Sequence, residues 1–274
     1  LLLVYLMNIA YGYFVESRGK RLITGLFGQY VPPELVDEMA QDPASFSMEG
    51  ESRELTILFS DVRGFTTISE SLDAKTLSEF INAFLTPFTR VIYKNRGTID
   101  KYMGDCIMAF WGAPNKTLYH ATQACLAAIE CNTRLKILAK EWTSQGRPGF
   151  KARIGLNTGD VVVGNIGSDQ RLSYTAMGDP VNLASRLEGL NKEYSTSIII
   201  SQSVLNELPD EFIYRLLDIV VVKGKTEPVP IYELVSRKGD VLAVGVYAQG
   251  LAVVAAEAGG VVGGVGRAEL QRSA

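Results

Sequence analysis

The chain has 274 residues, enough for one large domain with appendages. It carries 27 Lys and Arg against 30 Asp and Glu, a formal net charge of −3, so no basic footprint indicates nucleic-acid binding. The cysteines Cys106, Cys125 and Cys131 lie in apolar stretches without CxxC spacing, which favours buried thiols in a reducing compartment over disulfides or a zinc site. The single histidine, His120, begins a predicted helix, and we expect it to cap that helix or lie at the surface.

The N-terminal run Leu1–Val15 contains no charged residue. It is too short to cross a bilayer alone, which takes about 20 residues, and it lacks the features of a signal peptide. Arg18, Lys20 and Arg21 follow it, the order expected at the cytoplasmic end of a transmembrane helix. A buried hydrophobic helix or strand is the alternative reading. The sequence thus predicts that the domain after this segment lies on the cytoplasmic side, tethered to the inner face of the plasma membrane.

Residues 16–50 are predicted to form a helical connector. Leu22, Leu26 and Tyr30 make an apolar stripe at helical spacing, and Pro33 can begin a second short helix, Glu34–Ala40. Such a stripe can pair with its copy in a dimer or pack on its own domain, and both readings stay open.

The main domain is expected to span residues 51–237 and to begin with a buried strand in segment 55–65, which delivers the carboxylate Asp61. The following turn leads into a helix, which Thr67 and Glu70 are expected to open as a capping box. A loop that ends on a helix N-terminus offers backbone N–H groups to phosphate oxygens. The loop therefore predicts a triphosphate cradle, formed by Val62, Arg63, Gly64, Phe65 and Thr66.

After a helix over residues 76–94, two apolar segments, Thr98–Tyr102 and Cys106–Trp111, flank a break that is typical of a β-hairpin. The second segment is apolar on both of its alternating faces, so we expect this hairpin to be central in its sheet. Asp105 lies in the turn. Two strands that each end on an Asp, Asp61 and Asp105, can form a hard-oxygen site for Mg²⁺ or Mn²⁺.

The next predicted elements are a helix, Leu118–Trp142, and a second hairpin of strands Lys151–Asn157 and Asp160–Ile166 around Thr158-Gly159. The order strand–helix–strand–strand–helix–strand predicts an α+β fold, with a ferredoxin-like βαββαβ core sheet and helices on one face. Shorter elements follow: strands Ser197–Ser201, Phe212–Val222 and Val229–Leu234 and a helix Ser203–Leu208. Residues 238–274 are rich in Gly, Ala and Val, and we expect a poorly ordered tail, to which the sequence assigns no role.

Asp179-Pro180 predicts the start of another helix, as N-cap and first helical residue. Asn182 and Arg186 lie four residues apart in that helix, so both can face one ligand. A solvated helix face is the alternative for such a pair.

The motifs FSDVRGFT, KYMGDCIMAFWG and GDPVNLASRLE together resemble the class III nucleotide cyclases, from about Glu54 to Val235. The resemblance implies attack of the ribose 3′-hydroxyl of a nucleoside triphosphate on its own α-phosphate, assisted by two Mg²⁺ or Mn²⁺ ions. It implies metal ligands at Asp61, Asp105 and the Val62 carbonyl, and catalytic roles for Arg186 on the α-phosphoryl group and Asn182 on the ribose. Lys223, in VKGK, would bind the terminal phosphates.

Lys101 and Thr175 occupy the family's purine-reading positions and resemble the Lys/Thr pair of some bacterial adenylate cyclases. ATP is therefore the expected substrate and cyclic AMP the expected product. A threonine hydroxyl can accept from the adenine amino group or donate to the guanine carbonyl, so guanylate cyclase activity is the alternative.

In this family, each site takes its metal-binding and base-reading groups from different protomers, packed head to tail. This chain carries both sets, which implies a homodimer with two working sites. The first set is Asp61 and Asp105, and the second is Lys101, Thr175, Asn182, Arg186 and Lys223. Two other classes of protein are alternatives to a nucleotide cyclase. A diguanylate cyclase would carry Gly-Gly-Asp/Glu-Glu-Phe where this chain has Met103–Ile107, and a non-catalytic nucleotide-binding dimerisation module would typically lack a metal Asp or the Arg.

Overall fold

The computed structural model describes residues 33–41, 49–168, 170–221 and 227–239, together with Thr24, Phe27, Gly28, Tyr30 and Val31. The predicted membrane segment 1–15, Lys223 and nearly all of the C-terminal tail lie outside these residues. Among the residues described, no helix is both long enough and apolar enough to cross a membrane.

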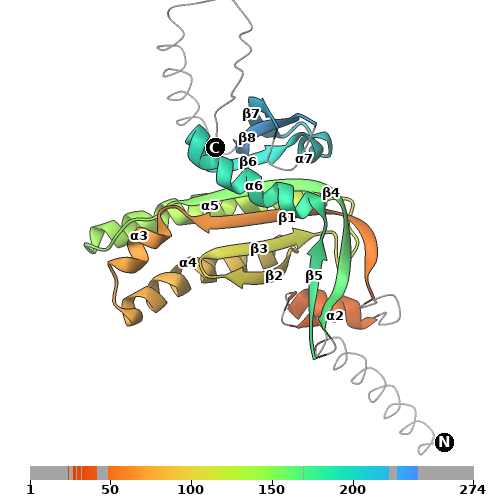
Figure 1. The fold of residues 1–274 in the computed structure, drawn as a ribbon, viewed down its shortest axis with the longest axis horizontal. Coiled ribbons are helices and arrows are strands. Elements are labelled where there is room, and N and C mark those ends of the chain that lie inside the picture. The colour runs from red at the N-terminus through yellow and green to blue at the C-terminus, as the bar shows by residue number, and fades with distance from the viewer. Residues whose placement is uncertain are drawn as a thin grey trace, which may run out of the picture.

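One eight-stranded sheet organises the described domain (Figure 1). Its strands follow the order β2-β3-β1-β4-β6-β8-β7, with β5 paired to β4 alone. Their bounds are β1 Glu51–Val62, β2 Thr98–Met103, β3 Cys106–Trp111, β4 Ala152–Ser168, β5 Arg171–Met177, β6 Ile198–Ser201, β7 Phe212–Val220 and β8 Val229–Arg237. The order β4-β1-β3-β2, with antiparallel neighbours throughout, is the predicted ferredoxin-like core.

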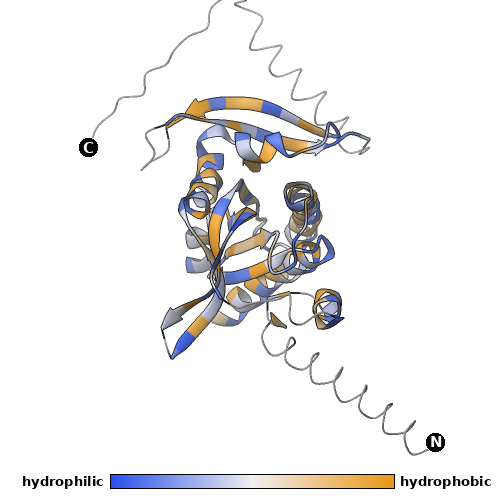
Figure 2. Ribbon diagram, turned by 90° about the vertical axis from the view of Figure 1, so that its right-hand side faces the viewer, coloured by the Kyte–Doolittle hydropathy of each residue, from blue (hydrophilic) through white to orange (hydrophobic). Residues whose placement is uncertain are grey.

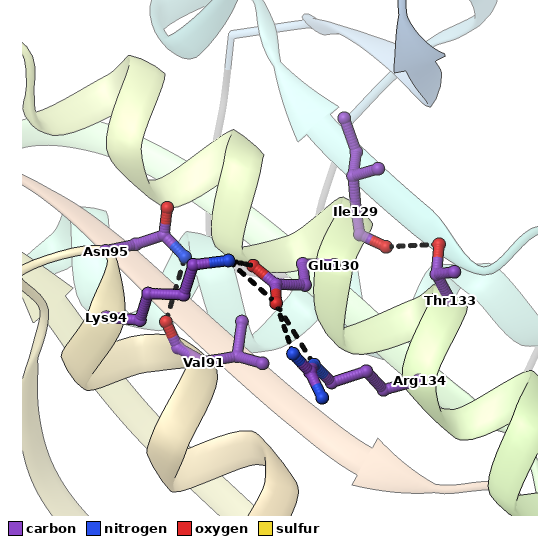
Figure 3. A network of polar contacts seen from close by, with 7 residues as sticks. All are labelled: Val91, Lys94, Asn95, Ile129, Glu130, Thr133 and Arg134. Atoms are coloured by element: carbon purple, nitrogen blue, oxygen red, sulfur yellow. Dashed lines mark hydrogen bonds and ion pairs between the residues drawn. The ribbon is translucent and has the colours of Figure 1, made fainter. Parts of the chain in front are cut away.

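The helices of the described residues are α2 Pro33–Gln41, α3 Phe65–Glu70, α4 Ala74–Lys94, α5 His120–Ser144, α6 Asp179–Tyr194 and α7 Gln202–Asn206. The two long helices of the ferredoxin-like core, α4 and α5, cover one face of the sheet, as predicted. Figure 3 shows one link between them: Glu130 on α5 accepts from Lys94 at the end of α4 and from Arg134 on its own helix.

Helices outside the βαββαβ core, α2 and α6, pack against the opposite face, which the sequence did not predict. Alternation along β1 explains the two layers: Leu58 belongs to the apolar cluster under α4 and α5, whereas Ile57 and Phe59 pack with α2 and α6. Figure 2 shows hydrophobic and hydrophilic bands alternating along some of the strands, the pattern of a strand with one face buried and one face in solvent.

The β2–β3 hairpin is not central, because β2 forms one end of the sheet. The predicted two-faced burial of β3 is nevertheless confirmed: Ile107 and Trp111 join one apolar cluster, and Met108 and Phe110 the other. Position at the sheet edge leaves the second half of β2, from Lys101 onward, exposed.

The predicted second hairpin around Thr158-Gly159 is wrong. These residues continue a single 17-residue strand, β4, in which Thr158 pairs with Thr56 and Gly159 with Leu55. The 12-residue strand β1 offers ladder partners from Ala152 to Val163, on both sides of these two residues, so pairing overrides the local turn signal. The actual hairpin joins β4 to β5.

The predicted short helix of the connector is confirmed as α2, beginning at Pro33. Apolar residues of the connector pack on the chain's own domain. Phe27, which precedes α2, lies edge-to-face on Tyr174, with ring centroids 5.2 Å apart, and Leu35 and Met39 of α2 are buried. Of the predicted stripe, Leu22 and Leu26 lie outside the described residues, and Tyr30 packs against Tyr174 of the chain's own domain, with ring centroids 6.1 Å apart.

Candidate active site

The predicted metal ligands Asp61 and Asp105 meet where β1 ends and the β2–β3 turn begins. Antiparallel pairing of β1 with β3 aligns Ser60 with Ile107, which brings the two carboxylates together. Asp105 Oδ2 accepts a hydrogen bond from the Val62 amide at 3.2 Å. Burial, followed by the hydrogen bond and negative charge of Asp61, raises the pKa of Asp105 to about 7. Two adjoining carboxylates that repel each other in this way form a donor set that fits a hard divalent cation.

Arg153 completes this acidic group and was missed in the sequence analysis. Its Nη2 lies 2.7 Å from Asp61 Oδ2, and its Nε lies 2.8 Å from Glu188 Oε1 on α6. Burial raises the pKa of Glu188 to about 7, although Arg153 acts in the opposite direction. The available signal was an arginine between two apolar residues of a predicted strand, because a charge in that setting needs a partner.

The predicted triphosphate loop follows Asp61 directly. Gly64 has a left-handed backbone, φ 75°, and caps α3, so the loop ends on a helix N-terminus as expected. The predicted capping box of Thr67 and Glu70 is absent, because the helix already begins at Phe65 and has no side-chain cap.

The predicted base-reading residues also meet. Lys101 Nζ on β2 lies 3.3 Å from Thr175 Oγ1 on β5. Behind them lies Asp100, which the sequence analysis did not select. Thr175 donates its hydroxyl to Asp100 Oδ2 at 2.6 Å, and Lys101 Nζ lies 3.1 Å from Asp100 Oδ1.

Asn182 and Arg186 lie on α6, whose N-cap is Gly178 rather than the predicted Asp179. Asn182 is exposed. One terminal nitrogen of Arg186, Nη1, is buried and has no hydrogen-bond partner among the residues that the structure describes. A buried guanidinium donor left unpaired by the protein is suited to an anionic ligand.

Within this protomer, therefore, the fold assembles Asp61 with Asp105, and separately Lys101 with Thr175. Over the described ranges, no hydrogen bond or ion pair joins the two groups.

His120 neither caps its helix nor lies at the surface. It is 7% exposed, and its Nδ1 lies 2.8 Å from Thr56 Oγ1 and 3.3 Å from Glu207 Oε2. Glu54, His120 and Glu207 together offer three potential metal-ligand atoms. The Nδ1 atom of His120, however, is already hydrogen-bonded to the Thr56 hydroxyl, which is in turn hydrogen-bonded to the Thr158 hydroxyl. We interpret this cluster as a structural link between α5, β1 and β4.

The cysteines are free, as expected. Burial, followed by the charge of Asp61, raises the pKa of Cys106 to about 12, so this thiol beside the acidic group stays protonated.

Comparison with known proteins identifies the family. Residues 48–236 match the adenylate and guanylate cyclase catalytic domain, and the chain belongs to this family. Cyclases of this family bind a nucleotide substrate and are generally metal-dependent.

Two similar proteins are adenylate cyclase 1 of Rhizobium meliloti, 37% identical over 76% of this chain, and an adenylate cyclase of Anabaena cylindrica, 36% identical over 78%. The aligned regions make up only 31% and 42% of those proteins. Among solved structures, the adenylyl cyclase CyaB from P. aeruginosa is 38% identical, with a TM-score of 0.66, over 70% of this chain and 99% of that one. The guanylyl cyclase Cya2 is 35% identical, with a TM-score of 0.64, over 71% and 98%.

Proposed function

We propose that this chain is an adenylate cyclase that converts ATP to 3′,5′-cyclic AMP and pyrophosphate. The observation that carries the proposal is the coexistence, on the family's fold, of the Asp61–Asp105 pair with the Lys101–Thr175 pair. The carboxylate pair is suited to bind the cations that accompany a triphosphate. The Lys101–Thr175 pair offers polar groups that can hydrogen-bond to the edge of a purine base. A non-catalytic module would need neither a complete acidic pair nor an unpaired Arg186.

The residues that would hold two Mg²⁺ or Mn²⁺ ions are Asp61, Asp105 and the Val62 carbonyl. When bound, such ions lower the pKa of the attacking 3′-hydroxyl and neutralise charge on the leaving pyrophosphate. Both carboxylates are already oriented by the protein, Asp61 by Arg153 and Asp105 by the Val62 amide.

Other groups of the chain bind and position the triphosphate. Within the predicted loop Val62–Thr66, the backbone N–H groups of Val62 and Arg63 already bind Asp105 and the Lys151 carbonyl. The N–H groups from Gly64 to Thr66, at the start of α3, would therefore donate to phosphate oxygens. Lys223 would contact the terminal phosphates. Arg186 would donate its free Nη1 to the α-phosphoryl oxygens, where charge develops during the displacement. Asn182, one turn earlier on α6, would orient the ribose so that its 3′-hydroxyl faces the α-phosphorus.

We propose that each site forms between two protomers in a head-to-tail homodimer. Among the described residues of one protomer, no hydrogen bond or ion pair joins the acidic pair to the base-reading pair, which supports this arrangement. So does the apolar surface next to the base-reading pair: Tyr102, Met103, Leu172 and Met177 are each between 44% and 53% exposed. Side chains of this kind on a monomer's surface suit a protein interface.

A membrane tether is also part of the proposal. It rests on the uncharged run Leu1–Val15 and the three cationic residues that follow it. Such a tether would hold the catalytic domain at the cytoplasmic face of the plasma membrane.

The direct test is turnover by the purified 274-residue chain, with Mn²⁺ or Mg²⁺, offered ATP and GTP separately. We expect cyclic AMP from wild type, little cyclic GMP, and neither product from Asp105→Asn. Dominant cyclic GMP would replace the adenine assignment by the guanylate cyclase alternative. No product at protein concentrations that enforce dimers would favour the non-catalytic module.

A further inference from the structure

We propose that Asp100 sets the purine preference of this site, by fixing the hydroxyl proton of Thr175 so that Thr175 can only accept a hydrogen bond from the base. The inference rests on the proposed nucleotide cyclase function and goes beyond it, because Asp100 itself need not touch the nucleotide.

The position of Asp100 is unusual for a carboxylate. It lies on β2, and its side chain is fully buried, with a relative exposure of 0%. Its Oδ2 accepts from the Thr175 hydroxyl at 2.6 Å and from the Ala176 amide at 3.1 Å. Its Oδ1 lies 3.1 Å from Lys101 Nζ. A buried carboxylate is stabilised by such donors, and it contacts both base-reading residues at once.

This contact decides the direction of the hydrogen bonds made by Thr175. An ionised carboxylate only accepts, so the single hydroxyl proton of Thr175 points at Asp100. Lys101 donates to the same hydroxyl oxygen at 3.3 Å. What Thr175 can still offer a ligand is a lone pair. Lys101 has donors and no acceptor. The pair therefore presents one donor and one acceptor.

That pattern matches adenine and opposes guanine. Adenine carries an acceptor at N1 and an amino donor at position 6, whereas guanine carries an N1–H donor and a carbonyl acceptor at position 6. With the base held in one orientation, guanine would set its O6 against the Thr175 lone pair and its N1–H against the Lys101 ammonium. Each unmatched buried polar contact weakens binding by about tenfold or more. A threonine without Asp100 would not discriminate in this way, because its proton could turn toward O6.

Wild-type protein can test this directly with nucleotides that differ at position 6. The probes are ATP, with an amino group, purine riboside triphosphate, with hydrogen, and inosine triphosphate, with a carbonyl. We expect kcat/KM to fall in that order, by about tenfold at each step. Inosine triphosphate turned over as well as, or better than, purine riboside triphosphate would show that Thr175 donates, and would overturn the proposal.

Variants then test whether Asp100 is responsible. We expect Asp100→Ala to lower the ATP/GTP ratio of kcat/KM by about tenfold, and Thr175→Val to do about the same. The double variant should lose little more than either single one, because Asp100 acts through the Thr175 hydroxyl. Asp73→Ala is the control: Asp73 also accepts from a threonine hydroxyl and backbone amides, but it caps α4, and its loss should leave the ratio unchanged.

A purely structural Asp100 would reduce turnover of ATP and GTP equally, and an unchanged ratio in Asp100→Ala would overturn the proposal. Competitive binding of 3′-deoxy-ATP and 3′-deoxy-GTP, which cannot cyclise, gives the same ratio without chemistry. If the wild type binds both but makes no cyclic product, the proposed function fails while this ratio still tests Asp100. If the wild type makes cyclic AMP and the variant keeps its ratio, only the role of Asp100 fails. If Asp100→Ala does not fold, the order of the three position-6 probes on wild type decides.

Discussion

Arg153 and Asp61 lie directly opposite each other in the β1–β4 ladder, with Nη2 and Oδ2 2.7 Å apart. The same guanidinium reaches Glu188 on α6, so one cation serves two carboxylates, with Asp105 as a third close by. The group therefore carries more negative than positive charge when all four side chains are ionised. This excess of negative charge favours the binding of divalent cations here. When no cation is bound, Arg153 stabilises the group by neutralising part of that charge.

Arg153→Gln should lower the free energy of unfolding by about 2–4 kcal/mol in metal-free buffer, because it leaves partly buried carboxylates without their cation. Urea denaturation of the variant and wild type in the presence of a chelator measures the difference.

The matched control is Arg153→Gln combined with Glu188→Gln. Removing one of the two carboxylates that have lost their cation should restore roughly half of the lost stability. The effects of the two substitutions are then coupled and do not add as independent effects would. Strictly additive losses would contradict the ion-pair geometry.

Asp105→Asn should abolish cyclase turnover, by about a hundredfold or more, since a neutral amide binds dications poorly. In chelator at pH 8 the same variant should be more stable than wild type, by on the order of 1 kcal/mol, because a carboxylate that is partly buried and also repelled by Asp61 has been neutralised. Formation of cyclic AMP measures the turnover, and thermal unfolding with and without Mn²⁺ measures the stability and the binding of the cation. Mn²⁺ should raise the Tm of wild type and leave that of the variant nearly unchanged; an equal rise in both proteins would place the cation elsewhere.

Gly155→Ala should destabilise the domain by about 2–3 kcal/mol and lower turnover. A Cβ at this position of β4 would lie 2.2 Å from the Glu188 amide nitrogen and 2.5 Å from the Ala184 carbonyl oxygen, which are backbone atoms of α6. The helix that carries Arg186 would have to move off the sheet.

Gly189→Ala on the same helix is the control, because no heavy atom lies within 4 Å of its added Cβ. It should stabilise the protein by roughly 0.5–1 kcal/mol through helix propensity and leave turnover intact. Equal stability of the two variants in urea would show that α6 does not approach β4 as closely as the structure has it.

Glu207→Gln should be as stable as wild type near pH 5 and more stable near pH 8, by on the order of 1 kcal/mol after solvent screening of a partly exposed group. Burial, and then the charge of Glu54, raises the pKa of Glu207 from 4.5 to about 7. The folded protein therefore holds this proton more tightly than the unfolded chain, and wild type loses stability as the pH rises from 4.5 to 7.

Urea denaturation at both pH values checks this prediction. The groups facing Glu207 are Glu54 and His120. Burial lowers the pKa of His120, which gives stability that is lost as the pH falls. Both variant and wild type retain His120, so the difference between them reports chiefly on Glu207. A difference that is larger at pH 5 than at pH 8 would contradict the assignment.

Sequence patterns predicted those parts of the molecule that depend on neighbours along the chain. Alternation identified the two buried faces of β3, and a strand followed by a Gly-bearing turn located Asp61 and Asp105. The family resemblance then selected Lys101 and Thr175, which the structure places 3.3 Å apart.

Features that depend on pairing across the sheet were missed. Thr158-Gly159 has the composition of a turn, yet the long partner β1 draws it into a continuous strand. Arg153 and Asp100 acquire their roles from partners 92 and 75 residues away. His120 is buried by contacts from β1 and from Glu207 just after α7, and the start of one helix gives no sign of either.

The central claim is that a working site takes its acidic pair from one protomer and its Arg186 from the other. Mixing two inactive variants tests it most directly: Asp105→Asn, defective in the metal half, and Arg186→Ala, defective in the catalytic half. After subunit exchange, half of the dimers are mixed, and each mixed dimer has one intact site of two, so cyclic AMP production should recover to about a quarter of the wild-type rate. No recovery, in a mixture shown to have exchanged subunits, would mean that each protomer builds its own site and would contradict the account.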